Sequence, residues 1–293
     1  MGAVAGAVAA LLAVVIALWS GWGDDPDRVA SDEEVRLFPT LARWDERGDL
    51  IVPIHGWIYE PEPDSRVRRW ALDAVQQHLK GGEDAPAAPG PPGESPEADA
   101  RLRARLALFL VDGERNKRVR VRVGRTVVRC APSDAKGHFF GEARLDAHDP
   151  LARSLRERAP DTLRDIEVVV DDGRTVRGVS IVPRPTPPEA SGPGKPGAPA
   201  GVAVVCDLDD TLKVSNVRSE RALFTSTFRE EWRAPEGMPA LVRTIVDSTG
   251  ATIHYLSAAR WPLQVEYEAF LLGEGLPLGS FHMREFDFSL RDI

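Results

Sequence analysis

The stretch of sequence that decides the fold is Val202–Thr211, which reads VAVVCDLDDT. Its first five residues form a continuous apolar run, which predicts a strand of a parallel sheet that is buried on both faces. The strand brings Asp207 to its carboxyl end, where ligands bind in open α/β sheets. Because side chains alternate along a strand, we expect Asp207 and Asp209 to point to the same side. The sequence therefore predicts a site built on two neighbouring carboxylates.

Two carboxylates held side by side need a cation nearby, because burial and like charge both oppose their ionisation. Mg²⁺ is the expected cation, since it prefers hard oxygen ligands and also binds substrate phosphates. One carboxylate can then attack phosphorus, while the other handles the proton of the leaving group. The alternative is an acidic turn after a core strand, with no chemistry of its own.

The segments that follow alternate between helix and strand patterns. Ala251–Leu256 predicts a second strand that ends in Ser257, whose hydroxyl can donate to a phosphoryl oxygen or simply cap a helix. The order strand, helix, strand, helix, strand predicts an α/β fold with a parallel sheet. The other predicted elements are helices over Pro235–Asp247 and Trp261–Leu272 and a strand over Ser280–Met283.

Residues 201–293 resemble a known enzyme family. The Asp207–Thr211 segment looks like motif I of the haloacid dehalogenase superfamily of phosphotransferases, and the wider pattern resembles the actin-patch type of phosphatidate phosphatase domain. The resemblance implies a Rossmannoid α/β sheet, Mg²⁺ as cofactor and a phosphorylated lipid as substrate, with a β-rich region before the catalytic domain. The segments that carry it are Cys206–Val217 (CDLDDTLKVSNV), Pro235–Val242 (PEGMPALV), Ile253–Leu263 (IHYLSAARWPL) and Gly275–Phe286 (GLPLGSFHMREF).

The resemblance implies a role for each residue of the site. Asp207 would be the nucleophile that becomes an aspartyl-phosphate, and Asp209 would be the general acid and base. Both would take part in the Mg²⁺ site, Asp209 through its backbone carbonyl. Thr211 would hold the loop and orient Asp209, and Ser257 would bind the phosphoryl group. Lys213 matches a lysine common after this motif, with a role in binding phosphate or positioning the loop; a surface lysine is the alternative.

The family also has features that do not appear before Ile293. The resemblance implies a downstream lysine, which neutralises phosphate charge, and a further acidic motif at the end of a fourth strand, which completes the Mg²⁺ site. The parallel sheet is therefore expected to be incomplete, with Val202–Cys206 as an apolar edge. We expect the 293-residue chain to be a C-terminally truncated form with little or no phosphatase activity.

Residues 45–182 predict a β-rich, sandwich-like domain that is interrupted by a loop at 81–98. Arg118–Val123 (RVRVRV) alternates strictly, so its valines are expected to face inward and its arginines outward. The Asp171-Asp172-Gly173 sequence predicts a tight turn between two paired strands. The other predicted strands are Ile51–Tyr59, His138–Leu145, and the two arms of this hairpin, Ile166–Val170 and Arg174–Val182.

The segments that flank this β-rich domain differ from it in amino-acid composition. Residues 183–200 are rich in Pro and Gly and predict a linker to the catalytic domain at 201–293. Residues 2–22 are uncharged and apolar, and a helix of that length crosses a hydrocarbon core of about 30 Å. We expect residues 1–22 to be a single-pass membrane anchor; export after cleavage of a signal peptide is the alternative, although a basic n-region and a clear cleavage site are missing.

The whole-chain composition excludes several classes of protein. A net charge of −8 and a pI near 5.4 disfavour a partner such as nucleic acid. Cys130 and Cys206 are the two cysteines and lie far apart, so a disulfide framework and a zinc cluster are not expected. The overall prediction is an α/β protein with an incomplete Rossmannoid sheet, preceded by a β-rich domain and an N-terminal hydrophobic helix.

Three functions remain open. The leading hypothesis is an Mg²⁺-dependent phosphatase that hydrolyses phosphatidate to diacylglycerol and phosphate through an aspartyl-phosphate. The second is a haloacid-dehalogenase-type phosphatase of a non-lipid phosphomonoester. The third is a membrane-tethered binding module with an inactive catalytic remnant, in which Arg118, Arg120 and Arg122 meet an acidic lipid surface. The alternative for these arginines is the solvated face of a half-buried sheet.

Overall fold

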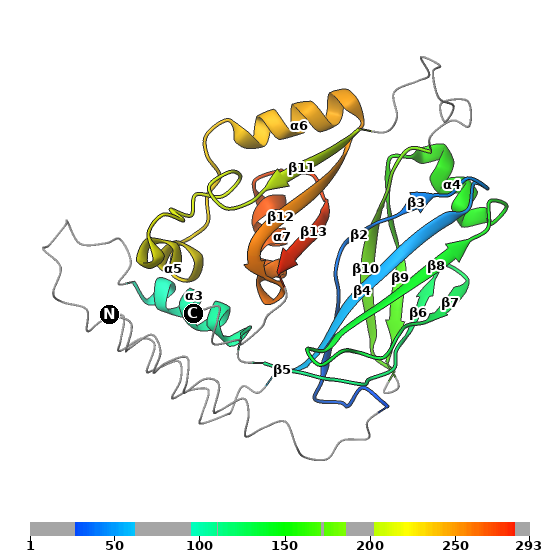
Figure 1. The fold of residues 1–293 in the computed structure, drawn as a ribbon, viewed down its shortest axis with the longest axis horizontal. Helices are drawn as coiled ribbons and strands as arrows, with labels where there is room; N and C mark the ends of the chain where they lie inside the picture. Colours follow the sequence, from blue (N-terminus) through cyan, green and yellow to red (C-terminus); the bar gives the residue numbers. More distant parts are fainter. Residues whose placement is uncertain (1–26, 62–94, 110, 171–172, 186–201, 285–293) are drawn as a thin grey trace, which may run out of the picture.

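The computed structural model describes residues 27–61, 95–109, 111–170, 173–185 and 202–284. In these residues the chain forms three β-sheets, of which two belong to the N-terminal part and one to the C-terminal part (Figure 1).

The N-terminal part is a sandwich of two five-stranded sheets. In the first sheet, β4 pairs antiparallel with β1, β3, β5 and β8; the second has the order β2-β10-β9-β6-β7. Both sheets bury their inner faces in one hydrophobic core. The elements are β1 (Glu34–Leu37), β2 (Thr40–Leu41), β3 (Arg43–Trp44), β4 (Leu50–Glu60), β5 (Asp112–Gly113), β6 (Arg120–Val123), β7 (Thr126–Arg129), β8 (His138–Leu145), α4 (Pro150–Arg158), β9 (Asp161–Val169) and β10 (Thr175–Val182).

Local sequence patterns account for these strands. The predicted pairing of the two hairpin arms is confirmed, since β9 and β10 pair antiparallel, while residues 171–172 of the predicted turn lie outside the described residues. In β6, Val121 and Val123 are fully buried while Arg120 is exposed, as the alternation predicts. The inward valines therefore fix which face of this strand meets the core.

The arginine row lies on the outer face of the second sheet, where it meets carboxylates of the same part of the chain. Arg122 pairs with Glu167, whose side chain is 16% exposed, and its Nη1 lies 3.7 Å from Asp165. Arg118 Nη1 lies 3.5 Å from a carboxylate oxygen of Asp27. These ion pairs favour the interpretation of the row as the solvated face of a half-buried sheet.

The C-terminal part contains a parallel sheet of three strands among the described residues, in the order β11-β12-β13. Its core is formed by one face of the sheet and the helices that pack on it. The elements are β11 (Ala203–Asp207), α5 (Glu220–Phe228), α6 (Met238–Thr249), β12 (Thr252–Arg260), the 3₁₀-helix η2 (Trp261–Leu263), α7 (Gln264–Gly273) and β13 (Ser280–Arg284). One helix from upstream, α3 (Pro96–Ala107), packs against α5 (Figure 1).

Two predictions about this fold are wrong. Strand β11 is not buried on both faces, because its side chains alternate and Val205 is 68% exposed. The α/β class is wrong for the chain, because strands predominate among the described residues and two of its three sheets are not parallel α/β sheets. The alternation of helix and strand that suggested this class covers only the C-terminal part, whereas the upstream part supplies most of the strands.

The predicted membrane anchor is not upheld by the structure. In the parts of the chain that the structure describes, no helix is both long and apolar enough to cross a bilayer. Residues 2–22, on which the prediction of a single-pass anchor and an N-terminal hydrophobic helix rested, lie outside the described residues, as does most of the predicted linker. The predicted domain boundaries stay predictions.

Candidate active site

The carboxyl end of β11 presents Asp207 to solvent. Asp207 is the last residue of the strand and is exposed, whereas the next residue, Leu208, is fully buried in the core. The chain then turns tightly, with Asp210 in the left-handed region at φ 58°. This turn changes the direction of the chain immediately after the strand and sends Asp209 inward.

Asp210 holds the turn together through its carboxylate. Its oxygens accept hydrogen bonds from the backbone amides of Val217 (2.8 Å), Ser215 (2.8 Å) and Asn216 (2.7 Å). These three amides, that of Val217 first, lower the pKa of Asp210 below its ordinary value. Asp210 thus fixes the loop over residues 210–217 by hydrogen bonds.

Asp209 is the most heavily bonded carboxylate of the site. Its Oδ1 accepts from Lys213 Nζ at 3.2 Å and from Ser215 Oγ at 2.7 Å. Its Oδ2 accepts from Ser257 Oγ at 3.0 Å, and the hydroxyl of Tyr267 lies 3.0 and 3.1 Å from the two oxygens. Four donors from three separate segments of the chain therefore fix the position of this side chain.

The other predicted site residues lie next to these two aspartates. Thr211 donates from Oγ1 to Asp207 Oδ2 at 3.3 Å, so it contacts the first aspartate, whereas the resemblance implied that it orients Asp209. Ser257 is 5% exposed and lies at the same edge of the sheet, because β12 runs parallel to β11. Its hydroxyl oxygen also accepts from the amide of Ala259 at 2.9 Å. The structure brings all five predicted residues together.

Lys213 is buried rather than being a surface lysine. Its side chain is fully shielded from solvent, and its ammonium lies 4.9 Å from the centre of the Trp232 ring. Burial lowers the pKa of Lys213, and the neighbouring Asp209 carboxylate opposes that shift. The ammonium also donates to Ser215 Oγ at 2.5 Å. Lys213 thus supplies a buried positive charge next to the Asp209 carboxylate.

Sequence reasoning missed two of the groups that hold Asp209. Ser215 lies inside the Cys206–Val217 segment, two residues after Lys213, so its place in the motif could have indicated a role. Tyr267 lies on α7, 58 residues from Asp209, within a helix that the sequence predicted without singling out any of its side chains. Burial raises the pKa of the Tyr267 hydroxyl well above its ordinary value, and the Asp209 charge adds to this shift.

The donors at the strand end fit a magnesium ion in part. The Asp207 carboxylate is exposed, and the backbone carbonyl of Asp209 accepts no hydrogen bond from the described residues. The Asp209 carboxylate is fully engaged by its four donors, so its carbonyl is the better ligand. No group of three or more His, Cys, Asp or Glu side chains within the described ranges is arranged to hold a metal. Waters and substrate oxygens would have to complete the coordination.

Trp261 connects the end of β12 to the β-rich part of the chain. Its ring lies 4.6 Å from that of Phe38 and 4.5 Å from that of His55, measured between ring centres. His55 Nε2 in turn lies 3.1 Å from His138 Nδ1, and its ring stacks on Phe140 at 4.5 Å. Burial, together with His138, lowers the pKa of His55 to about 3, so this histidine is neutral. The strand that carries Ser257 therefore ends in a contact with the N-terminal sandwich.

An exposed carboxylate, a second anchored carboxylate and a serine at one edge of a parallel sheet are typical of a phosphatase-type hydrolase. Residues 202–293 match the family model described as phosphatidate phosphatase APP1, catalytic domain. The match confirms, for residues 202–293, the family resemblance predicted from the motifs, and it supports a phosphatidate phosphatase-like hydrolase. No curated protein matches the chain.

Proposed function

We propose that the chain is an Mg²⁺-dependent phosphatase that removes phosphate from phosphatidate through an aspartyl-phosphate on Asp207. The observation that carries the proposal is the contrast between the two aspartates at the end of β11. Asp207 is exposed and is bonded only by Thr211 among the described residues, whereas Asp209 beside it is held by four donors. A nucleophile must be accessible, and a group that moves protons must be held in place.

In this proposal, an oxygen of Asp207 attacks the phosphorus of phosphatidate. The Asp207–phosphorus bond forms as the bond from phosphorus to the glycerol oxygen breaks, and Asp209, which enters this step in its protonated form, gives that proton to the departing diacylglycerol oxygen. Water then attacks the phosphorus of the aspartyl-phosphate while Asp209 takes up its proton, which releases phosphate and restores both aspartates. Ser257 donates its one hydroxyl proton to Asp209 in this structure and would turn it to the phosphoryl group when substrate binds.

Magnesium would be held by the Asp207 carboxylate and the Asp209 carbonyl, where it would neutralise negative charge on the phosphoryl group. Lys213 contributes a second, fixed positive charge through its contact with Asp209. Thr211 limits the rotation of Asp207 by donating to one of its oxygens. These residues orient the two carboxylates relative to the substrate phosphate.

The test compares the full chain with Asp207→Asn in Mg²⁺ buffer, using phosphatidate in mixed micelles and p-nitrophenyl phosphate in solution. The substitution is expected to lower kcat by at least about a thousandfold, because the nucleophile is lost. Asp247→Asn, an exposed change on α6, is the matched control and should leave kcat unchanged. Acid-quenched wild type should yield a phosphorylated peptide that contains Asp207. Measurable turnover that is equal in wild type and Asp207→Asn would contradict the proposal.

The same assay separates the alternatives. Faster turnover of the soluble ester than of phosphatidate would indicate a phosphatase of non-lipid phosphomonoesters. The ion pairs of Arg118 and Arg122 give the binding-module interpretation no specific support. That this 293-residue chain has little or no phosphatase activity stays a prediction, which the wild-type rate tests.

A further inference from the structure

Helix α3 belongs to the C-terminal core, although it precedes that part by about a hundred residues of sequence. Leu102 of α3 is fully buried, and Leu108 and Phe109 pack against the core of the parallel sheet. The Phe109 ring meets that of Phe228 on α5 at 5.7 Å between ring centres. In Figure 1, α3 lies beside α5 and away from the sandwich. A segment outside the 202–293 match therefore completes this core.

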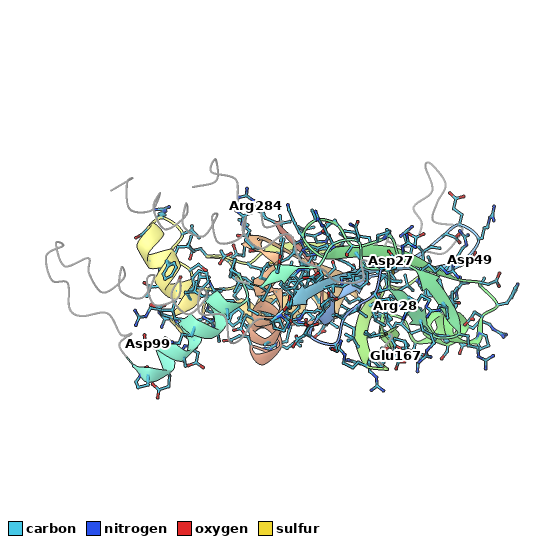
Figure 2. All side chains as sticks on the ribbon, turned by 90° about the horizontal axis from the view of Figure 1, so that it is seen from below. Asp27, Arg28, Asp49, Asp99, Glu167 and Arg284 are labelled. Carbon is cyan, nitrogen blue, oxygen red and sulfur yellow. The ribbon has the colours of Figure 1, made fainter. Side chains whose placement is uncertain are left out.

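One ion pair and one hydrogen bond hold α3 in this position. Asp99 accepts from Arg229 Nη2 at 2.8 Å, and Figure 2 shows Asp99 at the opposite end of the molecule from Asp49 of the sandwich. Arg101 donates to the carbonyl oxygen of Arg229 at 2.9 Å. The N-terminal end of α3 is thus bound to the end of α5.

Arg105 of α3 contacts residues that lie next to the candidate active site. Arg105 as a residue is 6% exposed, and its guanidinium donates to the carbonyl oxygens of Thr227 and Glu230 at 2.9 Å each and to Glu266 at 3.1 Å. The central carbon of the guanidinium, Cζ, lies over the Trp232 ring, 4.3 Å from its centre. An arginine buried this deeply is stable only with such a set of partners, and a lysine cannot reproduce the fork geometry.

Trp232 is connected to Asp209 through Tyr267. Its ring centre lies 4.5 Å from that of Tyr267, whose hydroxyl lies 3.0 Å from Asp209 Oδ1. Lys213 also lies over the Trp232 ring, at 4.9 Å. The indole nitrogen of Trp232 donates to two backbone carbonyls, so the ring has little freedom to rotate. The result is a continuous column of four side chains, defined here as Arg105, Trp232, Tyr267 and Asp209.

We propose that Arg105 is a positioning residue of the active site, which acts through Trp232 and Tyr267 to hold Asp209. The working site then extends beyond residues 202–293 to a helix supplied by the N-terminal half of the chain. The expected effect on turnover rests on the proposed function, but the effect on the structure of the Asp209 loop does not. Tyr267→Phe removes only the last hydroxyl of the column and tests its final link.

The test uses the full chain with Arg105→Gln and Arg105→Lys, and Arg103→Gln as the control, because Arg103 is exposed on the same helix. Hydrogen exchange of backbone amides is measured by mass spectrometry in peptides that cover residues 207–215 and, for comparison, β4. In Arg105→Gln, exchange over 207–215 should rise by about tenfold or more while β4 is unchanged. Arg103→Gln should match wild type, and Arg105→Lys should restore only part of the protection.

The kinetic comparison separates positioning from a general loss of stability. Arg105→Gln is expected to lower kcat by about ten- to a hundredfold with little change in KM, because Asp209 moves while substrate contacts stay. Combined with Tyr267→Phe, the loss should be less than the product of the two single losses, since both act on one column. Unchanged exchange over 207–215 in Arg105→Gln, or fully multiplicative losses, would overturn the proposal. If wild type hydrolyses no ester, the exchange data still decide the role of Arg105.

Discussion

Acidification should destabilise this protein through His55, which is held neutral between Trp261, Phe140 and His138. The pKa of His55 is lowered from 6.5 to about 3. Between these two pH values His55 is protonated in the unfolded chain and neutral in the folded chain. The stability contributed by neutral His55 is therefore present above pH 6.5 and is lost as the pH falls towards 3. At about 1.4 kcal/mol for each tenfold rise in proton concentration, the loss between pH 8 and pH 5 is about 2 kcal/mol.

The measurement is urea unfolding of wild type and His55→Gln at pH 8 and at pH 5. Wild type should lose about 2 kcal/mol more free energy of unfolding than the variant over this range. We compare the change in free energy of unfolding of the two proteins, because Glu114 changes that free energy with pH in the opposite direction. Burial, with the Glu33 charge, raises the pKa of Glu114 to about 7, so its contribution is largest at low pH and is lost as the pH rises through 7. The Glu114 contribution is the same in both proteins and cancels.

His148→Gln, a substitution of an exposed histidine in the sandwich, controls for the loss of a histidine as such and should behave like wild type. The reasoning would be refuted if His55→Gln and wild type lost the same free energy of unfolding on acidification. That result would mean that His55 is protonated or hydrated in the folded protein, and that the Trp261 contact is open.

Two further substitutions test the packing of the sandwich by urea unfolding. Lys117→Met removes the partner of the buried Glu33 carboxylate, 2.5 Å away, and should cost about 3–5 kcal/mol, most of which Lys117→Met combined with Glu33→Leu should recover. A failure of the double variant to recover would show that the pair is not the source of the loss. Gly56→Ala should cost about 1–3 kcal/mol, because its Cβ would lie 2.1 Å from the Phe139 ring and 2.8 Å from the Arg36 carbonyl oxygen. An unchanged midpoint would mean that β8 can shift to admit a methyl group.

Patterns within a few residues of each other were enough to predict much of the fold. The strict alternation in Arg118–Val123 and the Asp-Gly turn gave β6 and the β9–β10 hairpin. The apolar run before Asp207 predicted β11, and the alternating order of strands and helices predicted its parallel pairing with β12. The same run did not reveal that Val205 faces solvent, because an apolar residue on an uncovered sheet face looks like a core residue in sequence.

The residues around Asp209 could be predicted only where the motif itself contained them. Lys213 and Ser215 lie within six residues of Asp209 and belong to one turn of the chain. Tyr267 and Arg105 reach the site from helices that are distant in sequence, and helical periodicity shows which face is apolar without showing what that face contacts. Arg105 in particular reads as one of several arginines on a polar helix until its burial is known.

The arrangement of contacts divides the site into a part set by local sequence and a part set by the fold. Asp207 needs only the end of β11 and the Thr211 hydroxyl to be presented to solvent. Asp209 needs β12, α7 and, through Trp232, a helix that precedes the predicted linker. A chain can therefore keep the Asp207–Thr211 motif intact and still lose the geometry of its second aspartate. In the proposed function, the motif therefore predicts where phosphate would bind, while the contacts of α3 and α7 would keep Asp209 within reach of it.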